Sequence, residues 1–286
     1  MIPSKAVVTA ASPTEYHLPL QTLVDSEGVA KTALAIILDD LFAAGIDSAA
    51  IVIYPGTRDA FLHAAGKHAD RLTLIEQGSP RGYGHAVWSA NEFTGDDSFV
   101  LLVGDHLYLS QEGPSCVSQM LQVASGHDRC ISAVNPTHES QLRYYGAVAA
   151  TRVPASPSLF EVHDVVEKPT PTLAEQELIV PGLRAGNYLC FFGMHVLTAG
   201  VMEHLGREAI RIGEKHSLEL SPTLAFIANR EKYLAVELAG QRFNIGERYG
   251  LLRAQLSLAL AGPHRDQVLT DLIEITAHSR PACPDS

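Results

Sequence analysis

Strand-like and helix-like patterns alternate over the first hundred residues, and this alternation constrains the fold more than any other feature of the sequence. Short apolar runs typical of buried strands occur at residues 6–11, 50–54, 72–76 and 98–103. Between them, residues 31–44 have apolar side chains at three- and four-residue steps, and residues 58–69 and 85–92 also favour helices. Strands that alternate with helices form right-handed crossovers, so we predict a doubly wound, mostly parallel α/β sheet.

The pattern changes in the second half of the chain. Residues 145–153 and 159–166 are consecutive strand candidates joined by a Pro-containing turn, which favours an antiparallel pair. Further strands are expected at residues 188–193 and 241–245, and helices at residues 198–205, 222–230, 248–260 and 264–278. We therefore expect one domain over residues 1–262 with a mixed sheet, followed by a C-terminal helix and a frayed tail over residues 263–286.

Charge and composition exclude several classes of partner. The net charge is −11 and no cluster of five basic residues occurs, which argues against nucleic acid or an anionic membrane. The longest apolar stretches are too short to cross a bilayer, and no secretory segment precedes the first strand, so we expect a cytoplasmic protein. In that compartment Cys116, Cys130, Cys190 and Cys283 are expected as thiols rather than as two disulfides.

Two motifs follow predicted strands in the first half. Residues 76–87 contain three glycines between a strand and a helix, where a flat ring or a phosphate can approach the backbone. The alternative is an ordinary glycine-containing turn. Asp105 ends the apolar strand at residues 98–103, a position suited to holding Mg²⁺ against phosphates, although a turn or helix-capping aspartate would look the same.

A third motif, Glu167-Lys168-Pro169, ends the strand at residues 159–166. Because proline cannot continue a sheet, Pro169 places Glu167 and Lys168 at its rim. The lysine can pair with a phosphate there and the carboxylate can bind sugar hydroxyls. The alternative is an exposed ion pair that contributes little.

In this order, the motifs resemble those of sugar-1-phosphate nucleotidyltransferases, and most of all the bacterial UTP–glucose-1-phosphate uridylyltransferases. The resemblance spans residues 5–254 and rests on Gln77, residues 82–86 (Gly-Tyr-Gly-His-Ala), residues 104–105 (Gly-Asp), residues 145–146 (Tyr-Gly), residues 166–169 (Val-Glu-Lys-Pro) and residues 243–246 (Phe-Asn-Ile-Gly). It implies a Rossmann-like nucleotide-diphospho-sugar transferase fold. It also implies Mg²⁺-dependent transfer of a uridylyl group from UTP to a sugar 1-phosphate, expected to be glucose 1-phosphate, and a homo-oligomer is common in the family.

The resemblance also implies roles for individual residues. Residues expected to contact the nucleotide are Ala10, Ala11, Gln77, Gly82 and Tyr83, with Gln77 recognising the base. Residues expected to contact the sugar are Gly146, Glu167, Asn187 and Tyr188. Lys168 is expected beside the sugar phosphate, and Asp105 and Asn244 at the metal.

Two departures from the family pattern bear on activity. The family's triphosphate loop, Ala-Ala-Gly-x-Gly-Thr-Arg followed later by Pro-Lys, is replaced at residues 10–21 by a segment without glycine, lysine or arginine that gains Glu15. Asn244 stands where the family usually has a second metal-binding aspartate. Cations that could substitute are Lys31, Arg58, Arg81 and Arg143. Two functions therefore stay open: an active uridylyltransferase, or a protein that binds a nucleotide sugar for sensing or regulation.

Overall fold

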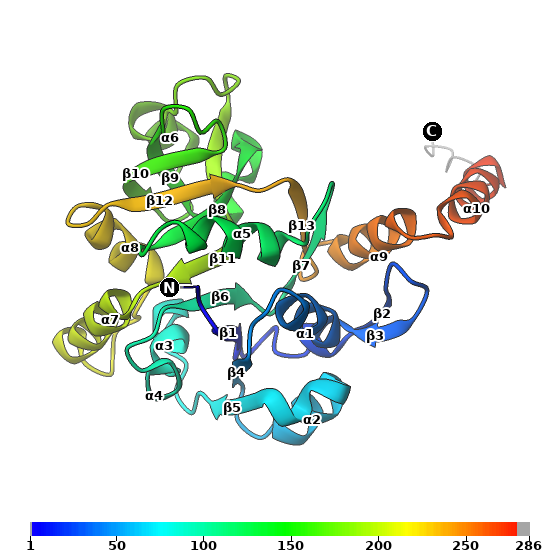
Figure 1. Cartoon of the computed structure of the whole chain (residues 1–286), viewed down its shortest axis with the longest axis horizontal. Coiled ribbons are helices and arrows are strands. Elements are labelled where there is room, and N and C mark those ends of the chain that lie inside the picture. Colours follow the sequence, from blue (N-terminus) through cyan, green and yellow to red (C-terminus); the bar gives the residue numbers. More distant parts are fainter. Residues whose placement is uncertain (1, 279–286) are drawn as a thin grey trace, which may run out of the picture.

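The computed structural model describes residues 2–278, in which a central mixed sheet is covered on both faces (Figure 1). Within the described chain its strand order is β5-β4-β1-β6-β11-β8-β12-β10-β9. The first four of these strands are parallel, and they are β5 (Leu72–Glu76), β4 (Ser48–Ile53), β1 (Lys5–Ala10) and β6 (Phe99–Val103). This half confirms the predicted doubly wound arrangement.

The other strands make the second half of the sheet more antiparallel, as predicted. They are β8 (Ile131–His138), β9 (Ala147–Arg152), β10 (Leu159–Val166), β11 (Asn187–Leu197) and β12 (Tyr233–Glu237). β11 is antiparallel to both β6 and β8, and β10 is antiparallel to both β9 and β12, whereas β8 and β12 are parallel. Two smaller sheets pair β2 (Thr22–Val24) with β3 (Ala30–Thr32), and β7 (His106–Ser110) with β13 (Gly240–Asn244).

Helices pack on the two faces of the central sheet because alternate strand residues point to opposite sides. In β1, for example, Val8 joins the core on one face and Val7 the core on the other. The first core includes residues of α1 (Ala33–Ala43), α2 (Arg58–Ala65), α5 (Cys116–Ser125) and α9 (Gly250–Ala261). The second includes residues of α3 (Tyr83–Trp88), α7 (Ala199–Ile212) and α8 (Leu220–Ala228). Shorter elements are α4 (Asn91–Thr94), α6 (Pro171–Glu177) and the 3₁₀ helices η1 (Leu18–Leu20), η2 (Gly66–Arg71) and η3 (Glu139–Tyr144).

α10 (Arg265–His278) lies furthest from the central sheet and follows α9 at one side of the molecule (Figure 1). None of its residues is buried, in keeping with the predicted C-terminal helix. The predicted frayed tail beyond residue 278 lies outside the described residues. No helix within residues 2–278 combines the length and apolar character needed to span a bilayer. The thiols of Cys116, Cys130 and Cys190 are free and buried, while Cys283 lies outside the described part of the chain.

Several element boundaries differ from those expected. The helix predicted from residue 31 begins at Ala33, because Thr32 caps it by accepting a 3.0 Å hydrogen bond from the Ala35 N–H while Lys31 pairs with β2. The strand predicted at residues 188–193 continues to Leu197. The sequence patterns predicted no counterpart of the strands β2, β3, β7, β8 and β12 or of the helix α5.

Candidate functional site

The carboxyl ends of β1, β5 and β6 border a cavity of about 320 Å³, here called the first cavity. Ligands of open α/β sheets bind at this edge, where parallel strands end. Six of the residues predicted to contact nucleotide or metal line it: Ala10, Ala11, Gln77, Gly82, Tyr83 and Asp105. The sequence motifs that contain them are thus brought to one place.

A second cavity of about 240 Å³ adjoins the first and shares Tyr83 and Val103 with it. Three of the predicted sugar and phosphate contacts line it: Gly146, Glu167 and Lys168. Its wall also contains residues that no sequence motif indicated, among them Phe191 and His195 of β11 and Glu219 and Ser221 of the α8 N-terminus. These residues lie far from the motifs in sequence, so only the fold brings them to the cavity.

Gln77 is buried, and two hydrogen bonds hold its backbone and its side chain in place. Its N–H donates to the Ile53 carbonyl at 3.0 Å, which continues the β5–β4 pairing beyond the strand end. Its side-chain Nε2 donates to Nδ1 of His85 at 2.6 Å. Burial, with a smaller contribution from Arg81, lowers the pKa of His85, so the imidazole is neutral and can accept that bond. The amide of Gln77 is therefore held at the wall of the first cavity.

Gly82 has a structural reason to be glycine. Its φ is +93°, and a Cβ on it would lie 2.7 Å from the Leu218 carbonyl oxygen and 2.7 Å from Glu219 Oε1. The N–H of Leu218 donates to Arg81 O, and the N–H of His85 donates to Leu218 O at 3.1 Å. The turn before α3 is thus bonded to the segment before α8. A side chain at Gly82 would disturb this contact between protein segments, whether or not a nucleotide is bound.

Asp105 projects into the first cavity beside His106. Gly104 precedes it, and the Gly104 N–H donates to the Thr9 carbonyl at 2.9 Å, so the chain leaves β6 against β1. Burial alone would raise the pKa of Asp105, but the adjacent His106, whose Nδ1 lies 2.9 Å from Oδ1, holds the pKa below its ordinary value. Asp105 is therefore ionised at neutral pH.

Asn244 lies next to Asp105 through the small β7–β13 sheet. It pairs with His106, and the following Ile245 N–H donates to the Asp105 carbonyl at 2.9 Å. Its side-chain oxygen accepts a 2.9 Å hydrogen bond from the Gly246 N–H, and it does not line either cavity. Residues 2–278 contain no group of three or more His, Cys, Asp or Glu side chains arranged to hold a metal.

Glu167 and Lys168 lie side by side at the rim of the second cavity. Ser221 Oγ donates to Glu167 Oε2 at 2.6 Å, and Lys168 Nζ lies 3.8 Å from Glu167 Oε1. Lys168 has a φ of +46°, a conformation uncommon for residues other than glycine, and its N–H donates to the Tyr145 carbonyl at 3.2 Å. Strained backbone of this kind is frequent at functional sites.

Gly146 is confined by the same wall. A Cβ at this position would lie 2.8 Å from a ring carbon of Phe191 and 3.0 Å from Glu167 Oε2. In contrast, Asn187 and Tyr188 line neither of the two cavities. The Asn187 side chain donates a 3.4 Å hydrogen bond to the Ala185 carbonyl, and Tyr188 is buried in a separate apolar cluster. Their predicted contact with the sugar gains no support from this placement.

The altered loop places a carboxylate in the first cavity. Glu15 lines it and accepts a 3.3 Å hydrogen bond from Ser12 Oγ. No lysine or arginine is among the described residues that line this cavity. Asp105 lines the same cavity, so two acidic side chains face it, which disfavours binding of a highly charged triphosphate.

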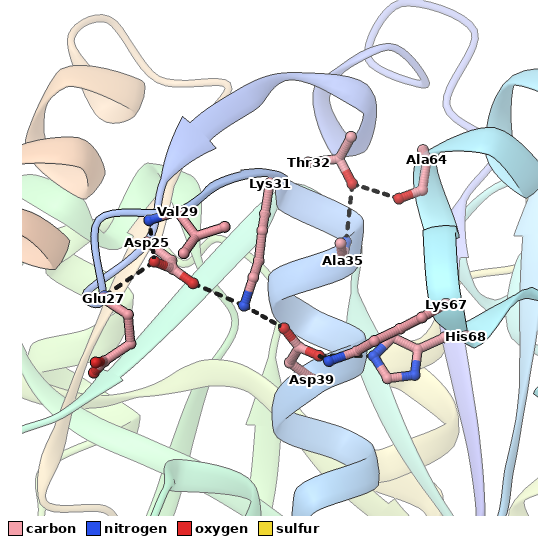
Figure 2. A network of polar contacts seen from close by, with 10 residues as sticks. All are labelled: Asp25, Glu27, Val29, Lys31, Thr32, Ala35, Asp39, Ala64, Lys67 and His68. Atoms are coloured by element: carbon pink, nitrogen blue, oxygen red, sulfur yellow. Dashed lines mark hydrogen bonds and ion pairs between the residues drawn. The ribbon is translucent and has the colours of Figure 1, made fainter.

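The cations considered as substitutes are engaged elsewhere. Lys31 Nζ lies 2.7 Å from both Asp25 and Asp39, with Lys67 and His68 on the far side of Asp39 (Figure 2). Arg81 donates to Gly213 O at 2.9 Å and Arg58 to Leu74 O at 3.3 Å, and the Arg143 guanidinium stacks over Tyr144. None of the four lines either cavity.

Known proteins are similar to this chain in sequence and in fold. The chain is 23% identical to UTP–glucose-1-phosphate uridylyltransferase 1 of Staphylococcus saprophyticus, over 94% of this chain and 97% of that protein. It is 26% identical to the UTP–glucose-1-phosphate uridylyltransferase of Streptococcus pyogenes, over 94% of this chain and 91% of the relative. A crystal structure of UDP-glucose pyrophosphorylase complexed with UDP-glucose has the same fold, with a TM-score of 0.72, 20% identity and coverage of 90% of this chain and 98% of the other.

The sequence model of the family described as Nucleotidyl transferase matches residues 26–258, which is most of the chain. The match includes the glycine-containing turn, Asp105 and the Glu167-Lys168 pair, and the fold agrees with it. The chain therefore belongs to the nucleotidyl transferase family.

Proposed function

We propose that this chain transfers a uridylyl group from UTP to glucose 1-phosphate, giving UDP-glucose and pyrophosphate. The observation that best supports this proposal is the junction of the two cavities at Tyr83 and Val103. An extended ligand can place its base beside Gln77 and its sugar beside Glu167, so that its phosphates cross the junction. The named uridylyltransferases to which the chain is similar support UTP and glucose 1-phosphate as the substrate pair.

In the proposed reaction a phosphate oxygen of glucose 1-phosphate attacks the α-phosphorus of UTP. A new oxygen–phosphorus bond forms, the bond from the α-phosphorus to the bridging oxygen breaks, and pyrophosphate leaves with that electron pair. Lys168 would neutralise the attacking phosphate from the rim of the second cavity. Glu167, oriented by Ser221, would accept hydrogen bonds from the sugar hydroxyls. Such a reaction depends on positioning and on charge neutralisation.

Asp105 at the first cavity fits a magnesium ion that is shared with the substrate. Mg²⁺ commonly binds through one or two protein oxygens together with phosphate oxygens and water. Asp105 would supply the charged ligand from the cavity wall. Asn244 lines neither cavity and its side-chain oxygen is bonded to the Gly246 N–H, so it would have to turn toward the cavity to supply a neutral ligand. When bound, the ion would offset charge on the phosphates during transfer. Magnesium dependence, a cytoplasmic location and a homo-oligomer remain predictions.

A pyrophosphate-release assay with UTP, glucose 1-phosphate and Mg²⁺ tests the proposal. We expect release by the wild-type protein and a loss of roughly 100-fold or more in Lys168→Ala. Lys232→Ala is the matched control, because Lys232 is likewise an exposed lysine beside a glutamate, 3.3 Å from Glu161. Absence of release with UTP and any sugar 1-phosphate would contradict the transferase proposal.

A second function is favoured by one specific observation, the lack of any lysine or arginine among the described residues that line the first cavity. A protein with Glu15 in that position can bind a nucleotide sugar, whose charge is lower, and fail to bind a triphosphate. Calorimetry distinguishes the two functions. Binding of UDP-glucose without binding of Mg²⁺-UTP, in a protein that releases no pyrophosphate, would support a sensing or regulatory role.

A further inference from the structure

Three polar side chains form a buried hydrogen-bonded row beneath the second cavity. His195 of β11, Ser132 of β8 and Tyr233 of β12 are 3%, 0% and 0% exposed. Ser132 Oγ lies 2.5 Å from His195 Nδ1 and also bonds to the Tyr233 hydroxyl. His195 and Ser132 are direct neighbours in the β8–β11 pairing, so the row crosses three adjacent strands. Of the three residues, His195 reaches the cavity wall.

An irregularity in β11 lies where the strand passes this cavity. The register of β11 on β8 shifts between Phe191 and His195. Within that interval Gly193 has a φ of +87°, and its carbonyl accepts a 2.7 Å hydrogen bond from the Tyr108 hydroxyl. Bulges commonly redirect side chains next to binding sites. Here the rings of Phe191 and His195 meet edge to face, 4.9 Å apart, and both line the cavity.

The protonation of the row follows from its burial. Burial lowers the pKa of His195 to about 3, so the imidazole is neutral and carries one N–H. Burial raises the pKa of Tyr233, so its hydroxyl keeps its proton. Within residues 2–278 the Tyr233 hydroxyl has Ser132 as its hydrogen-bond partner. Tyr233 must therefore donate to Ser132, because any other arrangement leaves a buried proton without an acceptor.

The remaining protons are then assigned by elimination. Ser132 already accepts from Tyr233, so its own hydroxyl proton goes to His195 Nδ1. Nδ1 is the acceptor, and the single imidazole proton lies on Nε2. No described protein group accepts from Nε2, and the ring lines the second cavity. The row therefore ends in one hydrogen-bond donor that is available to a ligand.

We propose that His195 Nε2–H is a fixed hydrogen-bond donor to the sugar of a nucleotide sugar in the second cavity, held in that tautomer by Ser132 and Tyr233. This inference rests on the proposed function, which places the sugar there. The cavity then offers complementary groups: His195 donates to one sugar oxygen, while the Glu167 carboxylate accepts from another hydroxyl. This combination suits a hexopyranose with an acceptor oxygen facing β11.

The tautomer is measured on the wild-type protein by long-range ¹H–¹⁵N correlation spectra of its histidines. The His195 signal is assigned as the one lost in His195→Phe. We expect a neutral ring protonated on Nε2 from pH 8 down to pH 5. A proton on Nδ1, or a charged ring in this range, would overturn the inference without touching the proposed function.

The ligand contact is measured by calorimetry with UDP-glucose and with UDP. We expect His195→Phe to bind UDP-glucose roughly ten-fold more weakly and UDP unchanged, since one hydrogen bond to the sugar is lost. Tyr233→Phe keeps the imidazole of His195 in place but no longer fixes its tautomer. This variant should therefore lose less UDP-glucose affinity than His195→Phe. His204→Phe is the matched control, because His204 stacks on Phe226 and lines neither cavity of the site.

The outcomes separate the two proposals. If His195→Phe is folded, as judged by its melting temperature, and binds UDP-glucose as tightly as the wild type, this inference is wrong and the proposed function stands. If the wild-type protein binds neither UDP-glucose nor UDP, the proposed function fails and the sugar contact fails with it. Equal losses for UDP-glucose and UDP would also contradict a contact to the sugar.

Discussion

Ser221 Oγ donates a 2.6 Å hydrogen bond to Glu167 Oε2 and so joins the first turn of α8 to the residue after β10, 54 positions away. Ser221 is buried, and Lys168 Nζ lies on the other carboxylate oxygen at 3.8 Å. The Glu167 carboxylate is thus oriented before any ligand binds. This pre-orientation is what a sugar-binding carboxylate requires.

Ser221→Ala should therefore weaken binding of the sugar part of the ligand without affecting binding of its nucleotide part. Loss of one hydrogen bond to a carboxylate predicts roughly five- to ten-fold weaker UDP-glucose binding in calorimetry and unchanged UDP binding. Ser125→Ala is a suitable control, because Ser125 is an exposed serine that bonds to the Gln122 carbonyl. Unchanged UDP-glucose affinity in Ser221→Ala would show that Glu167 does not contact the sugar.

Glu15→Lys should strengthen binding of Mg²⁺-UTP. The substitution replaces an anion on the wall of the first cavity with a cation, and UTP carries more negative charge than UDP-glucose. We expect UTP affinity to rise roughly ten-fold or more, with a smaller rise in Glu15→Gln and a weaker effect on UDP-glucose. A fall in UTP affinity would instead indicate that Glu15 helps to hold the metal. Calorimetry at two salt concentrations separates the charge effect from other causes.

Tyr83→Phe should preserve stability, whereas the same change at Tyr108 should not. The Tyr83 hydroxyl is buried at the junction of the cavities and has no hydrogen-bond partner of good geometry within the described residues, although the Thr9 side chain lies nearby. Its removal should change the free energy of unfolding, measured by urea denaturation, by less than about 1 kcal/mol. In contrast, Tyr108→Phe loses a 2.7 Å bond to Gly193 O and should lose about 1 kcal/mol. If Tyr83→Phe loses as much stability as Tyr108→Phe, the Tyr83 hydroxyl must have a hydrogen-bond partner in the folded protein.

Asp40→Asn should stabilise the protein at alkaline but not at acidic pH. Burial, together with the charge of Asp39, raises the pKa of Asp40 from 3.8 to about 7. The folded state therefore binds more protons than the unfolded chain between about pH 4 and pH 7, and wild-type stability falls as the pH rises through that window. Asparagine cannot ionise. At pH 8 the free energy of unfolding of Asp40→Asn should therefore exceed that of the wild type by about 1–3 kcal/mol.

Urea denaturation at pH 4, 6 and 8 measures this difference. It should be largest at pH 8 and close to zero at pH 4. Asp97→Asn provides the control, because the Asp97 side chain is exposed beside Lys5. A difference between Asp40→Asn and wild type that does not vary with pH would mean that Asp40 titrates normally.

The sequence predicted the parallel half of the fold because each strand there is short, apolar and followed by its own helix. The bounds of β5 and β10 agree with the predicted runs. β12 was not predicted, since it pairs in parallel with β8 across about a hundred residues, and no local pattern records that partner. Long-range pairing of this kind depends on the packing of the whole sheet.

The same distinction applies to the candidate site. Gln77, Asp105 and Glu167 belong to local strand-end motifs, and the fold brings them to the two cavities. Ser221 and His195 could not be predicted, because their importance comes from partners on other elements. The glycine requirement at Gly82 was predicted, but the structure gives it a different cause, the close approach of Leu218.

Tyr83 and Val103 belong to the walls of both cavities, so the two halves of a ligand would contact a common wall. We expect the half that enters first to fix the side chains of this wall, so that the second half binds to a wall that is already arranged. Uridine monophosphate and glucose added together should therefore show positive cooperativity. A single molecule that links them should exceed the sum of their separate binding free energies.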